Sequence, residues 1–197
     1  MTFLPENYED NDTSAEGNYA RLKEGANRFR IVGDHNDNTT IYGWEWWEDV
    51  GDKRVVHRFP HADKEEAMKT AAEASGGMEE PIRVKAFVST IAYSYDVEKA
   101  QILHFTQKSI KDPLRAFSKD KLWGDLRNYD VQINRTGEKL DTTYNVMPCP
   151  KAALDDEVIA KVNMALENWN LSALFDGDDP FAEAPAVAAQ PVAKDPY

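Results

Sequence analysis

The 197-residue sequence predicts a mainly β domain with a short inserted helix, a C-terminal helix and disordered acidic ends. Along the middle of the chain, apolar and polar residues alternate as they do in half-buried strands. The charge is uneven: residues 1–16 carry five acidic and no basic side chains, residues 17–150 carry 21 and 20, and residues 151–197 carry nine and three. The formal net charge of −12 therefore belongs mostly to the two ends.

Charge and composition divide the chain into four parts. We expect an acidic N-terminal arm at residues 1–16, a β domain at 17–150, a helical segment at 151–175 and a tail at 176–197. After Phe175 the composition shifts to Asp, Ala, Pro and Gly, with few large apolar side chains. Such a segment buries too little apolar surface to fold alone, so the tail is expected to be disordered.

The first expected strands carry basic side chains. Residues 27–32 alternate so that Arg28 and Arg30 share one face and apolar side chains the other. Residues 39–47 and 53–59 are expected to pair as a hairpin, because a turn-like sequence at 49–52 joins them. Arg54 and Arg58 share a face of the second hairpin strand.

The next elements are a helix and two strands. Residues 64–74 are expected to be helical, with Asp63 as the N-cap and Gly76-Gly77 at the end. Strands are expected at 82–95 and 100–107, with a turn between them. One alternation phase of the first of these strands contains Arg83, Lys85, Phe87, Tyr93 and Tyr95.

The remaining elements are a broken helical turn, a hairpin and a helix. Pro113 is expected to interrupt a helical turn at 108–118. Strands at 128–135 and 139–147 flank a tight turn at 136–138. Acids at 155–157 open a final helix, in which apolar residues recur at helical spacing. These residues are Val158, Val162, Ala165, Leu166 and Trp169.

Three of the five tryptophans lie in the single stretch Ile41-Tyr42-Gly43-Trp44-Glu45-Trp46-Trp47. In a strand, Tyr42, Trp44 and Trp46 share one face and Trp47 lies on the other. Such rings either stack on unpaired nucleic-acid bases or fill a β core. The sequence leaves both interpretations open for each ring.

Aromatic rings interleaved with basic residues are typical of proteins that bind single strands. Rings stack on bases while cations follow the phosphates. For each cation the alternative is a solvated strand face of mixed charge. The candidate nucleic-acid-binding residues are Arg28, Arg30, Tyr42, Trp44, Trp46, Arg54, Arg58, Arg83, Lys85, Tyr93 and Tyr95.

Catalytic motifs are not found. The sequence has no phosphate-binding loop, no Gly-x-Ser-x-Gly elbow and no His-Glu-x-x-His metal site. Cys149 is the only cysteine, which excludes an internal disulfide and disfavours a cysteine-based zinc site. We expect no enzyme activity, no cofactor and no metal. Without a signal peptide or an apolar run of membrane-spanning length, a cytosolic protein with no membrane partner is expected.

The acidic tail contains the same short sequence pattern twice. Asp178-Asp179-Pro180-Phe181 places acids before a Pro-aromatic pair, and Asp195-Pro196-Tyr197 repeats this order more weakly. A negative segment of this kind can compete with DNA for basic residues or be bound by partner proteins. The alternative is a solubilising tail without a partner.

Several blocks in a fixed order carry a family resemblance. They are Asn18-Tyr19-Ala20-Arg21-Leu22, Gly25-Ala26-Asn27-Arg28-Phe29-Arg30-Ile31, Gly43-Trp44-Glu45-Trp46-Trp47, Lys85-Ala86-Phe87-Val88, Tyr93-Ser94-Tyr95, Gln101-Ile102-Leu103-His104-Phe105-Thr106-Gln107-Lys108, Trp123-Gly124-Asp125 and Leu140-Asp141-Thr142-Thr143-Tyr144-Asn145-Val146. From Asn18 to Pro150 the chain resembles a tailed-bacteriophage single-stranded DNA-binding protein of the OB-fold type.

That resemblance implies an OB-like β-barrel that binds single-stranded DNA with little sequence preference. It also implies a role in phage DNA replication, recombination or repair, in the cytoplasm of the infected bacterial host. The family's acidic tail contacts replication proteins of the phage or host through a Pro-aromatic signature at its extreme end. Here the better copy, Asp178 to Phe181, is internal, and the candidate docking residues are Asp178, Asp179, Pro180, Phe181 and Tyr197.

Two other functions remain open at this point. The chain is alternatively an acidic interaction protein, a DNA mimic or regulator that binds a host or phage enzyme. RNA binding through the same fold is the third interpretation. Salt-dependent binding to oligo-dT separates the first alternative from DNA binding, and a preference for RNA identifies the second.

Overall fold

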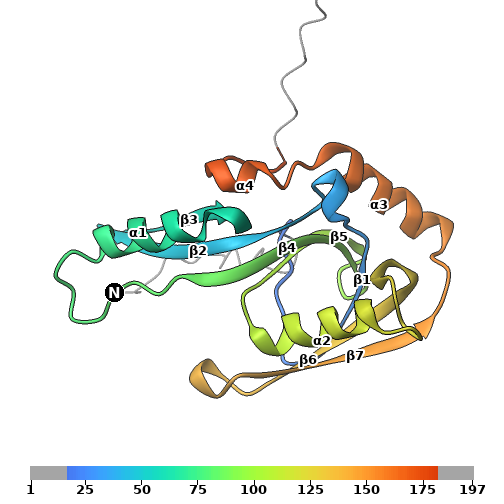
Figure 1. Ribbon diagram of the computed structural model, residues 1–197. Helices are drawn as coiled ribbons and strands as arrows, with labels where there is room; N and C mark the ends of the chain where they lie inside the picture. Colours follow the sequence, from blue (N-terminus) through green and yellow to red (C-terminus); the bar gives the residue numbers. More distant parts are fainter. Residues whose placement is uncertain (1–16, 182–197) are drawn as a thin grey trace, which may run out of the picture.

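The computed structural model describes residues 17–181 and has seven strands and four α-helices in that range (Figure 1). The strands are β1 (Gly25–Ile31), β2 (Thr40–Val50), β3 (Lys53–Pro60), β4 (Lys85–Ser94), β5 (Lys99–Phe105), β6 (Tyr129–Thr136) and β7 (Thr143–Lys151). The helices are α1 (Lys64–Ala74), α2 (Lys108–Lys119), α3 (Asp156–Asn168) and α4 (Ala173–Asp176). Single 3-10 turns lie at His35–Asp37, His61–Asp63, Leu126–Asn128 and Lys139–Asp141. The predicted mainly β fold is confirmed.

The strands form one antiparallel sheet in the order β3-β2-β4-β1-β6-β7, with β5 also paired to β4. The first half of β4 pairs with β2 and its last residues pair with β1, while β5 lies along the other edge. Beyond β4, β5 makes a parallel bridge between Ile102 and Tyr19. Within residues 17–181 no ladder joins β5 or β3 to β7, so closure into a barrel is not shown.

Two hydrophobic clusters hold the helices against the sheet. One packs α3 and α4 onto β4 and β5 through Phe87, Ile91, Ile102, Val162 and Leu174. The other packs α2 against β1, β5 and β6. In Figure 1, α3 and α4 lie on one side of the central strands and α2 on the other. Along β4, Phe87, Ile91 and Tyr93 belong to the first cluster, whereas Val88 and Ala92 belong to the second, as the two-residue period of a strand requires.

Most expected elements are present, with local differences. The predicted bounds of α1 are confirmed, although the side chain of Asp63 makes no capping hydrogen bond. The interruption expected at Pro113 is wrong, because α2 continues through it. The last strand starts at Thr143 instead of residue 139, since a 3-10 turn occupies Lys139–Asp141.

The expected tail boundary at residue 176 is also wrong. Residues 176–181 pack on the domain, where the amide of Asn170 donates to the carbonyl of Pro180 at 2.9 Å. The Phe181 ring lies edge-on to Trp169 at 4.9 Å and to Tyr19 at 5.8 Å between ring centroids. The candidate docking residue Phe181 therefore already has intramolecular partners. The rest of the tail, with Tyr197, and the arm at 1–16 lie outside the described residues.

No helix within residues 17–181 combines the length and the apolar composition needed to cross a membrane.

Candidate nucleic-acid interface

The β2–β3 hairpin carries the aromatic stretch and is covered differently on its two faces. A Cβ atom at Gly43 would approach Phe175 of α4, whereas the neighbouring Trp44 lines a groove with residues of α1. Because successive strand residues point to opposite faces, α4 and α1 cover opposite faces of β2. Figure 1 shows α1 lying along β2 and β3.

On the α1 face, three rings form a row that reaches solvent. Tyr42 is 48% exposed, and its ring centroid lies 5.3 Å from that of His61. His61 is stacked on Trp44 at 5.7 Å with an interplanar angle of 16°. The indole Nε1 of Trp44 donates to the carbonyl of His61 at 3.0 Å, and Nζ of Lys64 lies 4.9 Å from the Trp44 ring. We call Tyr42, His61 and Trp44 the ring row.

The ring row continues into a groove between α1 and the chain that returns from α1 to β4. This groove has a volume of about 440 Å³. Its lining residues are Trp44, Lys64, Met68, Ala72, Ser75, Pro81, Ile82 and Val84.

The opposite face of the hairpin has one further exposed ring near the turn. Trp47 is exposed, and the guanidinium of Arg54 lies 5.3 Å from its ring centroid. Arg54 also faces Asp49 at 3.7 Å. The two exposed rings of the hairpin, Tyr42 and Trp47, thus lie on different faces.

Three predicted binding residues do not reach the surface. Trp46 is 3% exposed and stacks on His57 at 4.0 Å, and Tyr93 and Arg30 are also buried. The predictions of an exposed basic face at Arg30 and of stacking rings at Trp46 and Tyr93 are corrected, because the surrounding elements cover both faces of these strands. The Trp46 indole nitrogen has no hydrogen-bond partner within the described residues.

Asp130 explains the burial of Arg30. Nε of Arg30 donates to Oδ1 of Asp130 at 2.6 Å, and Nε of Arg28 donates to Oδ2 at 2.7 Å. The Tyr95 hydroxyl donates to the same carboxylate at 3.0 Å. Burial and the adjacent Asp130 raise the pKa of Tyr95 to about 12. The cluster joins β1, β4 and β6, and only Arg28 is well exposed in it.

A second buried carboxylate, that of Glu45, lies on the face of β2 opposite the ring row. Glu45 accepts from Nε of Arg58 at 3.2 Å and lies 3.3 Å from Nε2 of His104. Burial acts to raise the pKa of Glu45, but His104 and Arg58 together hold it below its ordinary value. Arg58 is therefore a partner of Glu45 with little exposed surface, and not a free cation.

Ser89, His104 and Glu45 are connected in the order of a hydrolase catalytic triad, but a substrate cannot reach them. The hydroxyl of Ser89 lies 2.7 Å from Nδ1 of His104, whose other nitrogen faces Glu45. Ser89 is fully buried in β4. A nucleophile must touch the substrate, so this arrangement serves to satisfy buried polar groups.

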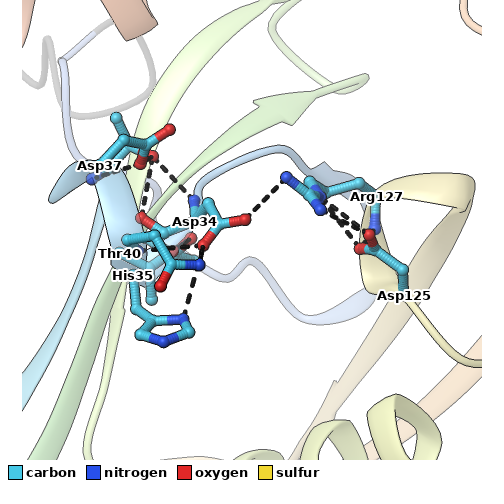
Figure 2. Close-up of polar contacts among 9 residues, drawn as sticks. Asp34, His35, Asp37, Thr40, Asp125 and Arg127 are labelled. Atoms are coloured by element: carbon cyan, nitrogen blue, oxygen red, sulfur yellow. Dashed lines mark hydrogen bonds and ion pairs between the residues drawn. The ribbon is translucent and has the colours of Figure 1, made fainter.

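A third polar cluster lies next to Arg30, whose Nη1 donates to the carbonyl of Arg127 at 3.2 Å. Figure 2 shows Arg127 between Asp34 and Asp125, with N–O distances of 2.8 Å and 2.7 Å. Arg127 also borders a pocket of about 540 Å³ together with Arg30 and Lys151. Arg30 and Arg127 already donate to protein oxygens, so Lys151 is the lining cation of this pocket that makes no ion pair within residues 17–181.

Two predicted cations remain on the surface at the start of β4 and just before it, and Lys85 pairs with Glu45, so it lies on the face of the sheet opposite Trp44. Arg83 and Lys85 are exposed, and the side chains of both lack hydrogen bonds and ion pairs to the rest of residues 17–181. Arg83 lies between two residues that line the groove. Lys111 of α2 instead donates to the carbonyl of Ala86 at 2.6 Å, and burial lowers its pKa.

Sequence reasoning missed His61, Lys64 and Asp130. His61 and His57 form the only close histidine pair in the sequence, which is a weak signal. Lys64 opens a helix, and nothing in its sequence context shows that the helix folds back over Trp44. Asp130 is 100 residues from Arg30, so only the β1–β6 pairing brings them together.

No protein-family model matches the chain, and no curated protein matches it. Across residues 17–181, no three His, Cys, Asp or Glu side chains are grouped in a way that could hold a metal ion.

Proposed function

We propose that the protein binds single-stranded DNA with little sequence preference, through the ring row on the α1 face of the β2–β3 hairpin. The observation that carries this proposal is the exposed Tyr42 ring in continuous contact with His61 and Trp44. Every base has a π-face, so stacking on rings gives affinity without selecting a sequence.

The phosphates in this proposal follow Lys64, which lies beside the rings, and the exposed cations at the start of β4. Lys64 lies over Trp44, and Arg83 and Lys85 are exposed without ion-pair partners among the described residues. Each phosphate contact on a single strand releases counterions, which gives a salt slope of about −0.7 per contact. Arg54 beside Trp47 is a further cation for a strand that passes the end of the hairpin.

The proposal includes an OB-like barrel built from β1, β4, β5, β6 and β7. An OB-fold is a partly open five-stranded barrel that binds oligonucleotides with its second and third strands, with the loop between its first and second strands and with the loop between its fourth and fifth strands. In this assignment, the segment with β2, β3 and α1 is that loop. The location of the ring row in this segment supports a nucleic-acid interface there.

Replication, recombination or repair of phage DNA is the proposed setting, on the strength of the sequence resemblance. The acidic ends are proposed to limit binding of DNA and to contact replication proteins. The packing of Phe181 against Tyr19 and Trp169 means that a partner must displace this ring before it can bind the Asp178-to-Phe181 peptide.

The test is a fluorescence-anisotropy titration of labelled oligo-dT at two salt concentrations, with Tyr42→Ala as the variant and Leu122→Ala as the matched control. Both side chains are exposed. Loss of one stacking ring should weaken binding by about 1–3 kcal/mol, and the control should bind normally. Absence of salt-dependent binding by the unmodified protein would favour the acidic interaction protein instead, and tighter binding of an RNA of equal length would favour RNA.

A further inference from the structure

We infer that the groove between α1 and residues 81–84 is a pocket for one unstacked nucleobase of the bound strand. This inference rests on the proposed function and adds to it a specific subsite. The groove begins at Trp44, the innermost member of the ring row, so a strand stacked on Tyr42 and His61 leads directly to it.

The chemistry of the walls fits the flat, apolar faces of a base. Met68 and Ala72 of α1 form one wall, and Pro81, Ile82 and Val84 form the other. The groove's volume of about 440 Å³ is within the range of about 300–1,000 Å³ that is usual for small-molecule sites. Met68 is 55% exposed, so the groove opens to solvent.

The polar atoms of the lining are nearly all in use. The Ser75 hydroxyl donates to the carbonyl of Ala71 at 2.6 Å and accepts from the amide of Ile82 at 2.8 Å. The Trp44 indole donates to His61. Among the lining side chains only Lys64 retains free donors, so the pocket recognises the shape of a base and not its hydrogen-bonding edge.

The charges around the groove indicate where the phosphate next to the inserted base lies. Lys64 borders the groove on α1. Arg83 is exposed but is not among the residues that line the groove. Glu79 and Glu80 precede Pro81 and make that end of the groove acidic. The phosphate next to the inserted base therefore lies on the Lys64 side.

Filling the groove tests the inference without altering the core. Ala72 is exposed on α1, and Ala160 is exposed on α3 far along the chain, so Ala72→Phe and Ala160→Phe form a matched pair. The probes are labelled oligo-dT and an oligonucleotide of equal length with abasic sites. Ala72→Phe should bind oligo-dT about 5- to 150-fold more weakly, the range for one lost base contact, and should discriminate less between the two probes. Ala160→Phe should behave as the unmodified protein.

A second pair keeps the test valid if Ala72→Phe does not fold. Met68→Glu places a carboxylate in the groove, while Met164→Glu makes the same charge change on α3, where Met164 is 67% exposed. Only Met68→Glu should lose affinity for oligo-dT. Normal binding by a folded groove variant would overturn the base pocket and leave the proposed function standing. No binding of oligo-dT by the unmodified protein would overturn the proposed function and the pocket with it.

Discussion

Asp130→Asn is expected to lower the stability of the fold strongly. The Asp130 carboxylate is buried and accepts from Arg30, Arg28 and Tyr95. An asparagine keeps the shape but removes the charge, and its amide would turn a donor toward one of the arginine donors. The buried guanidinium of Arg30 would then lack its counter-ion.

The magnitude follows from how deeply each partner is buried. Removing one member of a buried ion pair costs about 3–5 kcal/mol, because the other charge stays in the interior. Arg28 has 52% of its side chain exposed, so its share is at most about 1 kcal/mol. For a domain of this size, 1 kcal/mol lowers Tm by roughly 2–4 °C, which gives a decrease of about 6–20 °C for Asp130→Asn.

The assay is urea unfolding followed by far-UV circular dichroism, together with scanning calorimetry. Arg28→Gln is the control, because it removes the exposed partner and should cost no more than about 1 kcal/mol. A loss below about 1 kcal/mol for Asp130→Asn, at an unchanged m-value, would refute the view that this carboxylate neutralises a buried arginine.

Three further predictions concern pH, the packed tail segment and the acidic arm. The pKa of Glu45 is lowered in the folded protein, so its ionised form stabilises the fold above the unfolded pKa of about 4.3 and this stabilisation is lost as pH falls through the folded pKa. The free energy of urea unfolding should therefore depend less on acid pH for Glu45→Gln than for the unmodified protein. The same pH dependence for both proteins would contradict this. Phe181→Ala should lower the free energy of unfolding by about 1–3 kcal/mol, since two edge-on ring contacts contribute about 0.5–1.5 kcal/mol each, whereas the exposed Leu122→Ala should change it by less than about 0.5 kcal/mol. Removal of residues 1–16 deletes five acidic and no basic side chains, so the truncated protein should bind oligo-dT several-fold more tightly at low salt. The gain in affinity should vanish near 1 M salt, where the screening length is about 3 Å. Equal affinity of the two proteins at low salt would count against the arm as a competitor of DNA.

The strands could be predicted because local alternation and turn residues determine them. Gly51, with a positive φ in the hairpin turn, and the apolar spacing of Val158, Val162 and Ala165 are examples of signals that need no tertiary information. The predicted helix at 64–74 agrees with the structure for the same reason. The order of the strands in the sheet depends on long-range pairing, which the sequence alone does not reveal.

The candidate site was predicted only in part, because alternation indicates which residues share a face and not whether that face is covered. Arg28 and Arg30 share a face, yet only Arg28 reaches solvent, since Asp130 and the neighbouring strands enclose Arg30. Trp46 shares a face with Tyr42 but is buried, so one strand face holds both a core ring and a surface ring.

The packed tail segment had no signal in local composition. The partners of Phe181 are Tyr19 and Trp169, one of which is more than 150 residues away in sequence. Composition measures how much apolar surface a segment contains. The packing of residues 176–181 depends instead on a binding surface formed by residues distant in sequence. The ring contacts of Phe181 act together with backbone hydrogen bonds from Asn170 to Pro180 and from Asp178 to Ala173.

The most direct test of the central claim is photochemical cross-linking of the full chain to oligo-dT that carries 5-iodouracil, followed by mass spectrometry of the cross-linked peptides. Stacking on the ring row predicts cross-links at Tyr42, His61 and Trp44, which disappear when excess unlabelled oligo-dT is added. Cross-links confined to β6, β7 or α3, with none between residues 42 and 64, would contradict the claim that single-stranded DNA binds on the β2–β3 hairpin.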